Sequence, residues 1–318
     1  MRFELTSDQV DLVDGVRKLT QGRFPVSRVR QLADAPGAVD RPLWRELAEF
    51  GLFSLRVPEA DGGSGLGLAD AVLAFEVLGH ALVPGPLVAT HLAPSAGVRD
   101  EVVGAIDATT SPLVVEHLDA LDTIVVVASD GLRAIEPGAL DTTELVATDP
   151  LTAVHRVDRL PDGGDALGGP DAAAQWRIES ECLTAALLLG IAQTALDMSV
   201  AYAKERQQFG RPIGSFQAVK HMLADMLVRT ELARSSVYAA AVTVDDPEVG
   251  DPARAVAGAK LLAGRAATTN GSEGVQVHGG MGFTWEVDVH LALKRAWVLD
   301  AAWGNEDAHA ESVAARLV

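Results

Sequence analysis

Cysteine is nearly absent from this sequence, because the chain of 318 residues has only one, Cys182. A single thiol excludes a disulfide framework and argues against a cysteine-based metal centre. The eight histidines are scattered without the short spacings that metal ligands show. We therefore expect no metal site in this protein.

Aromatic residues are also scarce, at 5% of the chain, and long uncharged apolar runs are missing. A membrane-spanning helix needs about 18 consecutive apolar residues, and residues 1–8 hold no apolar segment of the signal-peptide kind. Hydrophobic residues still make up 48% of the chain, and small aliphatic ones dominate, which favours closely packed helices. The sequence predicts a cytoplasmic protein without membrane contact.

Positive charge is in short supply as well. Lys and Arg number 26 against 44 Asp and Glu, which gives a formal net charge of −18. Such a chain should repel nucleic acid and anionic membranes. An anionic cofactor would need locally concentrated Arg or Lys.

The first part of the chain is predicted to be helical. Ser7 can cap a first helix, a second is expected over residues 26–33, and a third begins near Asp40 with Pro42 in its first turn. Gly51 follows the third helix as a typical terminating glycine. After a loop, another apolar helix is expected from Leu68 to about Ala81.

A short stretch of β-branched runs follows. Residues 113–116 and 123–128 are rich in Val and Ile, and Asp-Gly and Pro-Gly pairs separate such runs. This pattern indicates a small β region.

Helical spacing returns from Glu179 onward. The first helix there should stop at the Gly-Arg-Pro sequence of residues 210–212, and Ser215 should cap the next. The last two helices are expected to run from Pro252 to about Val277 and to begin near Asp288. The predicted fold is mainly α, with a helical domain (1–96), a reduced central β domain (97–178) and a C-terminal four-helix bundle that forms an oligomer core (179–318).

Two segments stand out. Residues 206–221 read Arg-Gln-Gln-Phe-Gly-Arg-Pro-Ile-Gly-Ser-Phe-Gln-Ala-Val-Lys-His, and residues 276–286 read Gln-Val-His-Gly-Gly-Met-Gly-Phe-Thr-Trp-Glu. An Arg at a helix end can fork onto a pyrophosphate, and a Gly-Gly pair lets backbone amides approach an anion. Together with Val-Pro-Glu at 57–59, these segments resemble the acyl-CoA dehydrogenase family.

The resemblance implies a role for these residues in holding FAD. In this family the matching positions bind the ADP half of an FAD that belongs mainly to the neighbouring subunit. The residues assigned to it by resemblance are Arg206, Gln208, Phe209, Gln276, Gly279 and Gly280, together with Gln217.

The base that this family needs is not found at its usual place. Dehydrogenation requires a carboxylate to remove the α-proton. Counting from Gly279-Gly280 places Trp303 at the usual Glu, and an indole cannot accept a proton. The position that some members use instead is Ser180, flanked by Glu179 and Glu181, which point about 100° away on a helix.

The β region also departs from the family. A Thr-Glu-Pro-x-x-Gly-Ser-Asp-like segment is missing, although Ile135-Glu136-Pro137-Gly138 matches part of it. The chain thus resembles the smaller, degenerate subunits of actinobacterial α2β2 acyl-CoA dehydrogenases of steroid catabolism. That resemblance implies a catalytic partner subunit, a bulky acyl-CoA substrate and an electron-transfer flavoprotein as electron acceptor.

Two alternatives stay open at this point. The chain could be a self-sufficient homotetrameric dehydrogenase that uses Glu181 or Glu179 as its base. It could also be a non-enzymatic scaffold subunit that has lost contact with FAD.

Overall fold

The structure is a computed structural model that describes residues 4–34, 39–99 and 101–317. These residues form two compact units, each built from separate stretches of the chain. The first unit comprises the N-terminal residues through Val26, Val72–Val83, and the chain from Thr184 onward. The second comprises Ser27–Ala71 and Pro84–Leu183.

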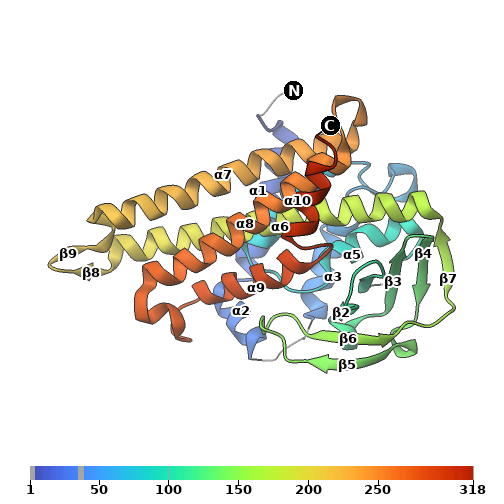
Figure 1. The fold of residues 1–318 in the computed structure, drawn as a ribbon, viewed down its shortest axis with the longest axis horizontal. Helices are drawn as coiled ribbons and strands as arrows, with labels where there is room; N and C mark the ends of the chain where they lie inside the picture. Colours follow the sequence, from blue (N-terminus) through green and yellow to red (C-terminus); the bar gives the residue numbers. More distant parts are fainter. Residues whose placement is uncertain (1–3, 35–38, 100, 318) are drawn as a thin grey trace. The chain divides into compact units, whose positions relative to one another are not determined.

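The first unit is helical. Figure 1 shows its long helices α7, α8 and α9 running side by side, and α10 packs against α8. Its helices are α1 (Ser7–Arg23), most of α6 (Pro170–Glu205), α7 (Gln217–Asp245), α8 (Pro252–His278), α9 (Val289–Ala301) and α10 (Glu306–Ala314), with the end of α4 (Leu68–His80).

One buried amide joins three of these helices. Asn270 on α8 donates hydrogen bonds to the carbonyl oxygens of Ala192 on α6 and Met226 on α7, at 3.3 and 3.1 Å. It also donates to the Thr230 hydroxyl on α7, at 2.9 Å. A buried amide that is satisfied in this way fixes the arrangement of the bundle, because any shift would leave polar groups unpaired.

Helix α8 carries its glycines where neighbouring groups approach closely. A Cβ atom at Gly271 or Gly274 would collide with Leu293 or Val289 of α9, and one at Gly264 would collide with the Asp300 carboxylate. Small residues at these positions let the two helices pack at short range.

Helix α6 has 36 residues and, among the described parts of the chain, is the one helix long and apolar enough to cross a membrane. In its most apolar window 78% of the residues are buried within the structure. The core helix of a soluble protein meets the same criterion of length and composition.

The second unit combines short helices with two small sheets. Parallel pairing of β1 with β3, and antiparallel pairing of β3 with β4 and β4 with β7, make the first sheet, while β2, β6 and β5 make the second. The α-helices are α2 (Val26–Ala33), α3 (Arg41–Glu49), the start of α4, α5 (Leu87–Leu92) and the first turns of α6. The strands are β1 (Val103–Asp107), β2 (Val114–Glu116), β3 (Thr123–Ala128), β4 (Gly131–Ile135), β5 (Asp141–Leu145), β6 (Val154–Arg159) and β7 (Asp165–Gly168).

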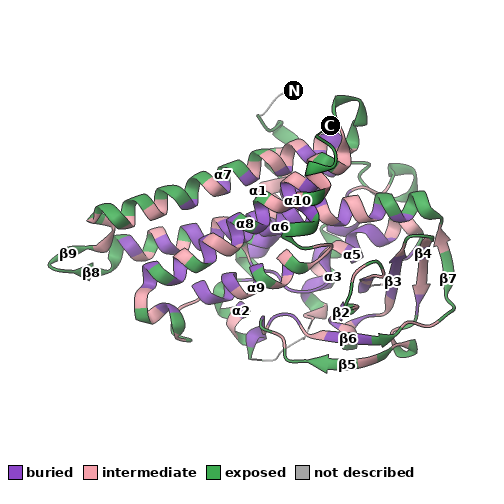
Figure 2. Ribbon diagram, viewed as in Figure 1, coloured by how far each residue is buried: buried purple, intermediate pink, exposed green. Residues whose placement is uncertain are grey.

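Short 3₁₀ turns connect the longer elements of both units. They are η1 (Leu52–Ser54), η2 (Glu59–Asp61), η3 (Ala93–Ala96), η4 (Leu118–Ala120), η5 (Pro137–Ala139), η6 (Ile213–Ser215), η7 (Pro247–Val249) and η8 (Gly279–Phe283). Figure 2 shows the core as purple segments along α8 and β3, whereas the hairpin that follows α6 is green, because its residues are exposed.

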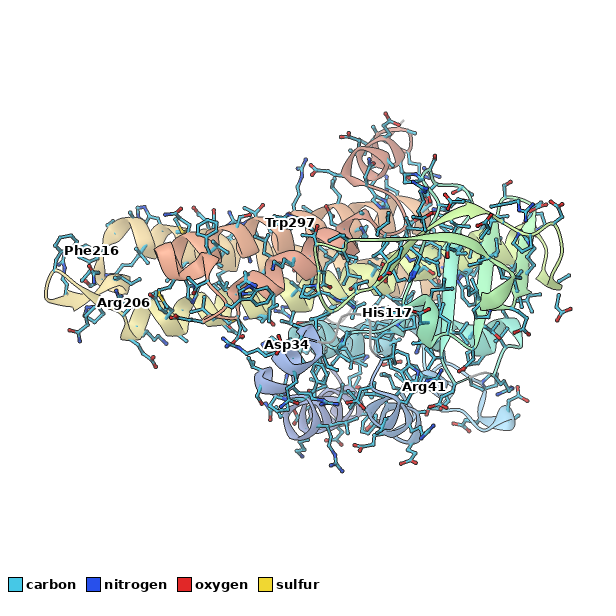
Figure 3. The ribbon with its side chains drawn as sticks, turned by 90° about the horizontal axis from the view of Figure 1, so that it is seen from below. Asp34, Arg41, His117, Arg206, Phe216 and Trp297 are labelled. Atoms are coloured by element: carbon cyan, nitrogen blue, oxygen red, sulfur yellow. The ribbon has the colours of Figure 1, made fainter. Side chains whose placement is uncertain are left out.

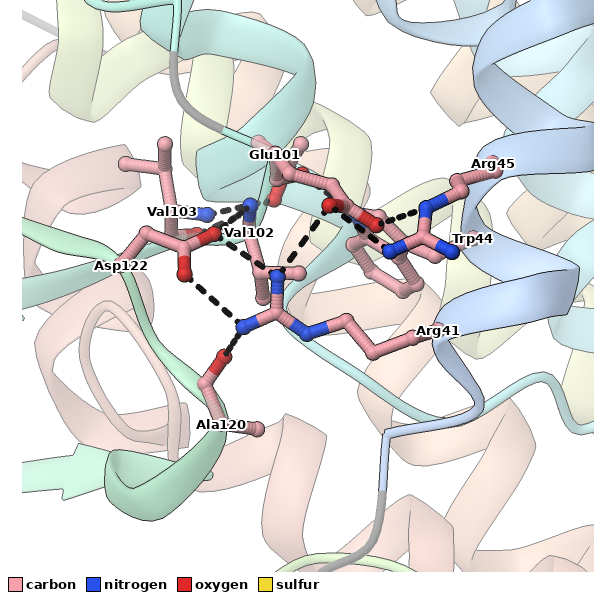
Figure 4. Close-up of polar contacts among 9 residues, drawn as sticks. Arg41, Trp44, Arg45, Glu101, Val102, Val103, Ala120 and Asp122 are labelled. Carbon is pink, nitrogen blue, oxygen red and sulfur yellow. Dashed lines mark hydrogen bonds and ion pairs between the residues drawn. The ribbon is translucent and has the colours of Figure 1, made fainter.

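Arg41 ties the start of α3 to the segments that lead into β1 and β3 of the second unit (Figure 4). Both terminal nitrogens of Arg41 donate to the Asp122 carboxylate at 2.9 Å, and one also donates to the Ala120 carbonyl. Asp122 in turn accepts from the backbone N–H of Val102. The hydrogen bond from Arg41 lowers the pKa of Asp122 below its usual value, so this pair stays charged at neutral pH.

Several predicted helix boundaries are confirmed. Helix α2 occupies residues 26–33, Asp40 caps α3, and α8 begins at Pro252 after the Asp251 cap. The mainly α fold with a small β region is confirmed too, while the domain boundaries after residues 96 and 178 stay predictions.

Other boundaries differ from the sequence prediction. Thr6, not Ser7, caps α1, because its hydroxyl accepts from Gln9 and the Gln9 side chain accepts in return. Ser215 lies in η6, and α7 begins after Phe216 without a side-chain cap. Helix α6 begins at Pro170 rather than Glu179, since a proline suits a first turn.

Candidate functional site

The first part of the candidate site is the hairpin that follows α6. The N–H of Arg206 donates to the Tyr202 carbonyl at 2.8 Å and so completes the last turn of the helix. The chain then forms β8 (Gln207–Gln208) and β9 (Arg211–Pro212), joined by a two-residue turn. Figure 3 shows Arg206 and Phe216 close to this hairpin at one end of the first unit.

The turn of the hairpin presents an aromatic ring to solvent. Phe209 and Gly210 have φ angles of 52° and 75°, as a type I′ turn requires. A left-handed backbone costs a bulky residue about 1–2 kcal/mol. Phe209 nevertheless adopts it, and its side chain is 90% exposed, with an edge contact to Phe216 at 6.0 Å between ring centroids. Such an exposed, strained aromatic is typical of a binding residue.

The hairpin gathers positive charge in an acidic protein. Between residues 204 and 221 the sequence has four basic residues and one acidic residue. Arg211 lies over the ring of Phe216, with its guanidinium carbon 4.2 Å from the ring centroid. Within the described parts of the chain Arg206 makes no ion pair, so its five donors are available to a ligand.

Two glutamine side chains of this region have local partners. Gln208 donates to the Gln207 carbonyl at 2.8 Å, and Gln217 lies 2.8 Å from the imidazole of His221. Both side chains are exposed, so their other polar atoms can reach a ligand.

The second part of the candidate site is the turn that ends α8. Gly279 has φ 61° and ψ −141°, a backbone conformation that only glycine adopts without strain. No atom lies within 4 Å of where a Cβ would stand at Gly279 or Gly280. The backbone is therefore open to a close approach by a ligand, and the exposed Gln276 lies one turn earlier on the helix.

A ring stack brings the two parts together. Tyr202, one turn before Arg206, stacks on His278, the residue before Gly279, with 4.1 Å between ring centroids and 24° between ring planes. Burial lowers the pKa of His278, so the imidazole is neutral at neutral pH, and its Nδ1 lies 2.7 Å from the Gly274 carbonyl. The ends of α6 and α8 thus meet at one end of the first unit.

The position expected for the base holds an indole. Trp303 follows the end of α9 with φ 61°, and Gly304 after it has φ 109°. A left-handed tryptophan is a backbone outlier. The alternative position, Ser180, is fully buried, and its hydroxyl finds no partner among the described residues.

The two glutamates beside Ser180 both lie close to arginines of the second unit. Arg56 forks onto both oxygens of Glu179 at 2.8 and 2.7 Å, and Gln175 adds a third hydrogen bond. Glu181 lies 3.9 Å from Arg177. Both carboxylate oxygens of Glu179 are therefore engaged by Arg56 within the unit.

His91 lies outside the motifs of the sequence described above. Its imidazole lines a cavity of about 380 Å³ in the second unit, together with Arg56 and Arg99. Burial lowers the pKa of His91 to about 4, while its Nδ1 lies 2.9 Å from the Leu52 carbonyl. No spacing in the sequence marks this residue, because its surroundings come from distant segments. Tyr202 could have been identified from the sequence as a neighbour of the site, since it lies one helical turn before Arg206.

Comparisons with known proteins agree with these motifs. The family descriptions "Acyl-CoA dehydrogenase, N-terminal domain" and "Acyl-CoA dehydrogenase, C-terminal domain" match residues 6–98 and 172–318. The chain is 39% identical over 289 residues to acyl-CoA dehydrogenase IpdE2 of Mycobacterium tuberculosis, covering 84% of each protein.

Two solved structures share the whole fold at 25% identity. One is the ChsE4–ChsE5 complex of Mycobacterium tuberculosis, with a TM-score of 0.85 over 100% of this chain and 99% of that one. The other is a variant of the Tcur3481–Tcur3483 steroid ACAD, with a TM-score of 0.83 over 97% of both chains.

Proposed function

The chain belongs to the acyl-CoA dehydrogenase family, and we propose that it is the subunit of a dehydrogenase complex that completes an FAD site held mainly by a partner subunit. The proposal rests on one end of the first unit, where Arg206 has no acidic partner among the described residues and the Gly279-Gly280 backbone is open. The stack of Tyr202 on His278 joins the two helix ends there.

The residues present fit the diphosphate of FAD. Arg206 would fork onto phosphate oxygens, and the backbone at Gly279 and Gly280 would approach them without steric hindrance from side chains. Gln208, Gln217 and Gln276 would donate hydrogen bonds. Phe209 would pack against the nucleotide or against the partner.

The remaining chemistry would belong to the partner subunit. When bound, FAD supplies the hydride acceptor for the α,β-dehydrogenation of an acyl-CoA. Trp303 cannot take up the α-proton, and Glu179 is held by Arg56, which supports a chain that binds and orients but does not abstract a proton. We therefore expect this chain to be inactive when it is alone.

The likeness to multichain relatives supports an α2β2 assembly. The ChsE4–ChsE5 structure is a complex, and the Tcur3481–Tcur3483 structure is described as a steroid ACAD. We propose a bulky, steroid-derived acyl-CoA as the substrate in lipid metabolism, an electron-transfer flavoprotein as electron acceptor, and the cytoplasm as the location.

The decisive experiment measures flavin in the complex. We expect Arg206→Ala to weaken FAD retention about 10- to 100-fold, since a charge-assisted hydrogen bond contributes about 1.5–3 kcal/mol. The readout is the flavin-to-protein ratio of the complex that copurifies with a tagged chain.

A matched control is Arg229→Ala. Arg229 lies on α7 of the same unit, where it donates to Asn270 and pairs with Glu273. Its loss should lower stability and leave the flavin content unchanged. An Arg206→Ala complex with the normal flavin content would refute the proposal and favour a scaffold without FAD. A yellow, active chain in isolation would favour the homotetramer that uses Glu181 or Glu179.

A further inference from the structure

The two parts of the proposed diphosphate site lie far apart in sequence. Arg206 and Gly279 are about 70 residues apart, on the ends of different helices. A diphosphate can meet both only if the spacing between those helix ends is fixed, because a misplacement of about 1 Å weakens such contacts strongly. No hydrogen bond joins the Arg206 side chain to residues 276–280 in the described structure.

A small apolar cluster lies one helical turn before this site. Val275 on α8 packs with Val289 and Leu293 of α9, and Met198 on α6 lies against that cluster. Tyr202 follows Met198 by one turn, and His278 follows Val275 by one turn. The stacked rings of Tyr202 and His278 therefore follow this cluster in the direction of the proposed site.

Each ring belongs to a residue whose backbone is close to one part of the site. The Tyr202 carbonyl accepts the N–H of Arg206 at 2.8 Å. His278 is the last residue of α8, and its Nδ1 lies 2.7 Å from the Gly274 carbonyl, where a neutral imidazole donates its proton. The Gly279 N–H closes the same turn by donating to the Gln276 carbonyl. The contact between the two rings therefore joins the two helix ends that carry Arg206 and Gly279.

We propose that Tyr202 and His278 are positioning residues that set the distance between Arg206 and the Gly279-Gly280 backbone. This inference rests on the proposed function. The rings act through their stacking and do not themselves need to touch the cofactor. A ring stack suits this task better than an aliphatic contact, because its planar surfaces fix both separation and tilt.

The chain offers a matched control for the tyrosine. It has only two tyrosines, and the other, Tyr238 on α7, lies in the same unit. The Tyr238 hydroxyl donates to Glu76 at 2.6 Å. Neither residue belongs to the two segments that form the site. Tyr238→Leu therefore removes a ring and a hydrogen bond from the same bundle without touching the stack.

The test compares three variants in the copurified complex by titration of the apo-complex with FAD. We expect Tyr202→Leu to weaken FAD binding roughly three- to tenfold, as expected for one aromatic pair. Tyr202→Phe keeps the ring and should bind FAD normally. Tyr238→Leu should lower the melting temperature and leave FAD affinity unchanged.

Comparison with Arg206→Ala separates the two proposals. If Arg206→Ala loses FAD but Tyr202→Leu binds it as well as Tyr238→Leu does, the positioning role is refuted and the proposed function stands. If Arg206→Ala keeps its FAD, the proposed function fails, and the positioning role fails with it.

Amide hydrogen exchange of the flavin-free complex gives a readout that does not depend on FAD. We expect Tyr202→Leu and His278→Leu each to speed exchange at residues 206–213 and 279–283, and the double variant to add little to either. Unchanged exchange in these segments, or fully additive effects of the two variants, would overturn the coupling of the two ends.

Discussion

The arginines of the second unit and those of the hairpin after α6 differ in what they contact. Arg41, Arg56 and Arg177 each bind a carboxylate of their own unit, namely Asp122, Glu179 and Asp107. Arg206 and Arg211 make no ion pair within the described residues. In a chain with a net charge of −18, we take the arginines without an acidic partner among the described residues as the mark of the proposed ligand site, and the paired arginines as structural.

The largest expected effect on stability concerns a paired arginine of the second unit, Arg56. Glu179 is 6% exposed, and Glu179→Gln leaves Arg56 without its anion. We expect a loss of about 3 kcal/mol in the free energy of unfolding, at the low end for a broken buried pair because Arg56 is partly exposed. Denaturant unfolding of the complex measures this loss.

The same variant tests the alternative base. The activity of the folded complex should be unchanged, because Glu179 has a structural role in our proposal. A loss of turnover of about a hundredfold or more with normal stability would assign proton abstraction to this chain.

The next effect concerns pH and lies in the same unit. His91 has a pKa of about 4 in the fold against 6.5 in the unfolded chain, chiefly because burial disfavours its charged form. The unfolded state therefore takes up the proton first as the pH falls, and this contribution to stability is lost between about pH 6.5 and pH 4. Between about pH 7 and pH 5 the loss should amount to about 2 kcal/mol.

The variant His91→Asn isolates this contribution, because the amide nitrogen can still donate to the Leu52 carbonyl and does not titrate. The stability of the parent chain minus that of His91→Asn should fall as the pH is lowered. A difference that stays flat over this pH range would show that the imidazole is not held neutral.

The smallest effect tests the hairpin, where stability and binding should move in opposite directions. Phe209→Gly removes a bulky side chain from a left-handed backbone and should raise the free energy of unfolding by up to about 1 kcal/mol. The flavin content should fall, because the exposed ring is lost. If stability falls and flavin is retained, Phe209 is a packing residue. The hairpin would then resemble the second unit, whose residues are held by contacts within the chain.

Much of the fold could be predicted from the sequence because its signals are local. Asp40 with Pro42, and Asp251 with Pro252, mark helix starts by chemistry within a few residues. The start of α6 was missed because its first turns mix small and apolar residues with charged ones, so the apolar spacing becomes clear only around Leu183. The α10 helix was not predicted, since residues 306–314 show little periodicity.

The candidate site was predictable only in part. Resemblance pointed to Arg206 and the Gly279-Gly280 pair, whose roles stay predictions. The ion pair of Glu179 with Arg56 could not be foreseen, because the two residues are over a hundred positions apart and neither motif includes Arg56. The surroundings of His91 were hidden for the same reason, since tertiary contacts decide its charge.

The close contact between α8 and α9 limits which substitutions the glycines of α8 can accept. At Gly264, Gly271 and Gly274 even one added methyl group would collide with the neighbouring segment. Substitution of these glycines should therefore destabilise the protein. Gly258 lies on the same helix with open space around its Cβ position and is free to vary. Among related sequences, variation along α8 should therefore follow the clearance around each glycine more closely than its distance from any ligand.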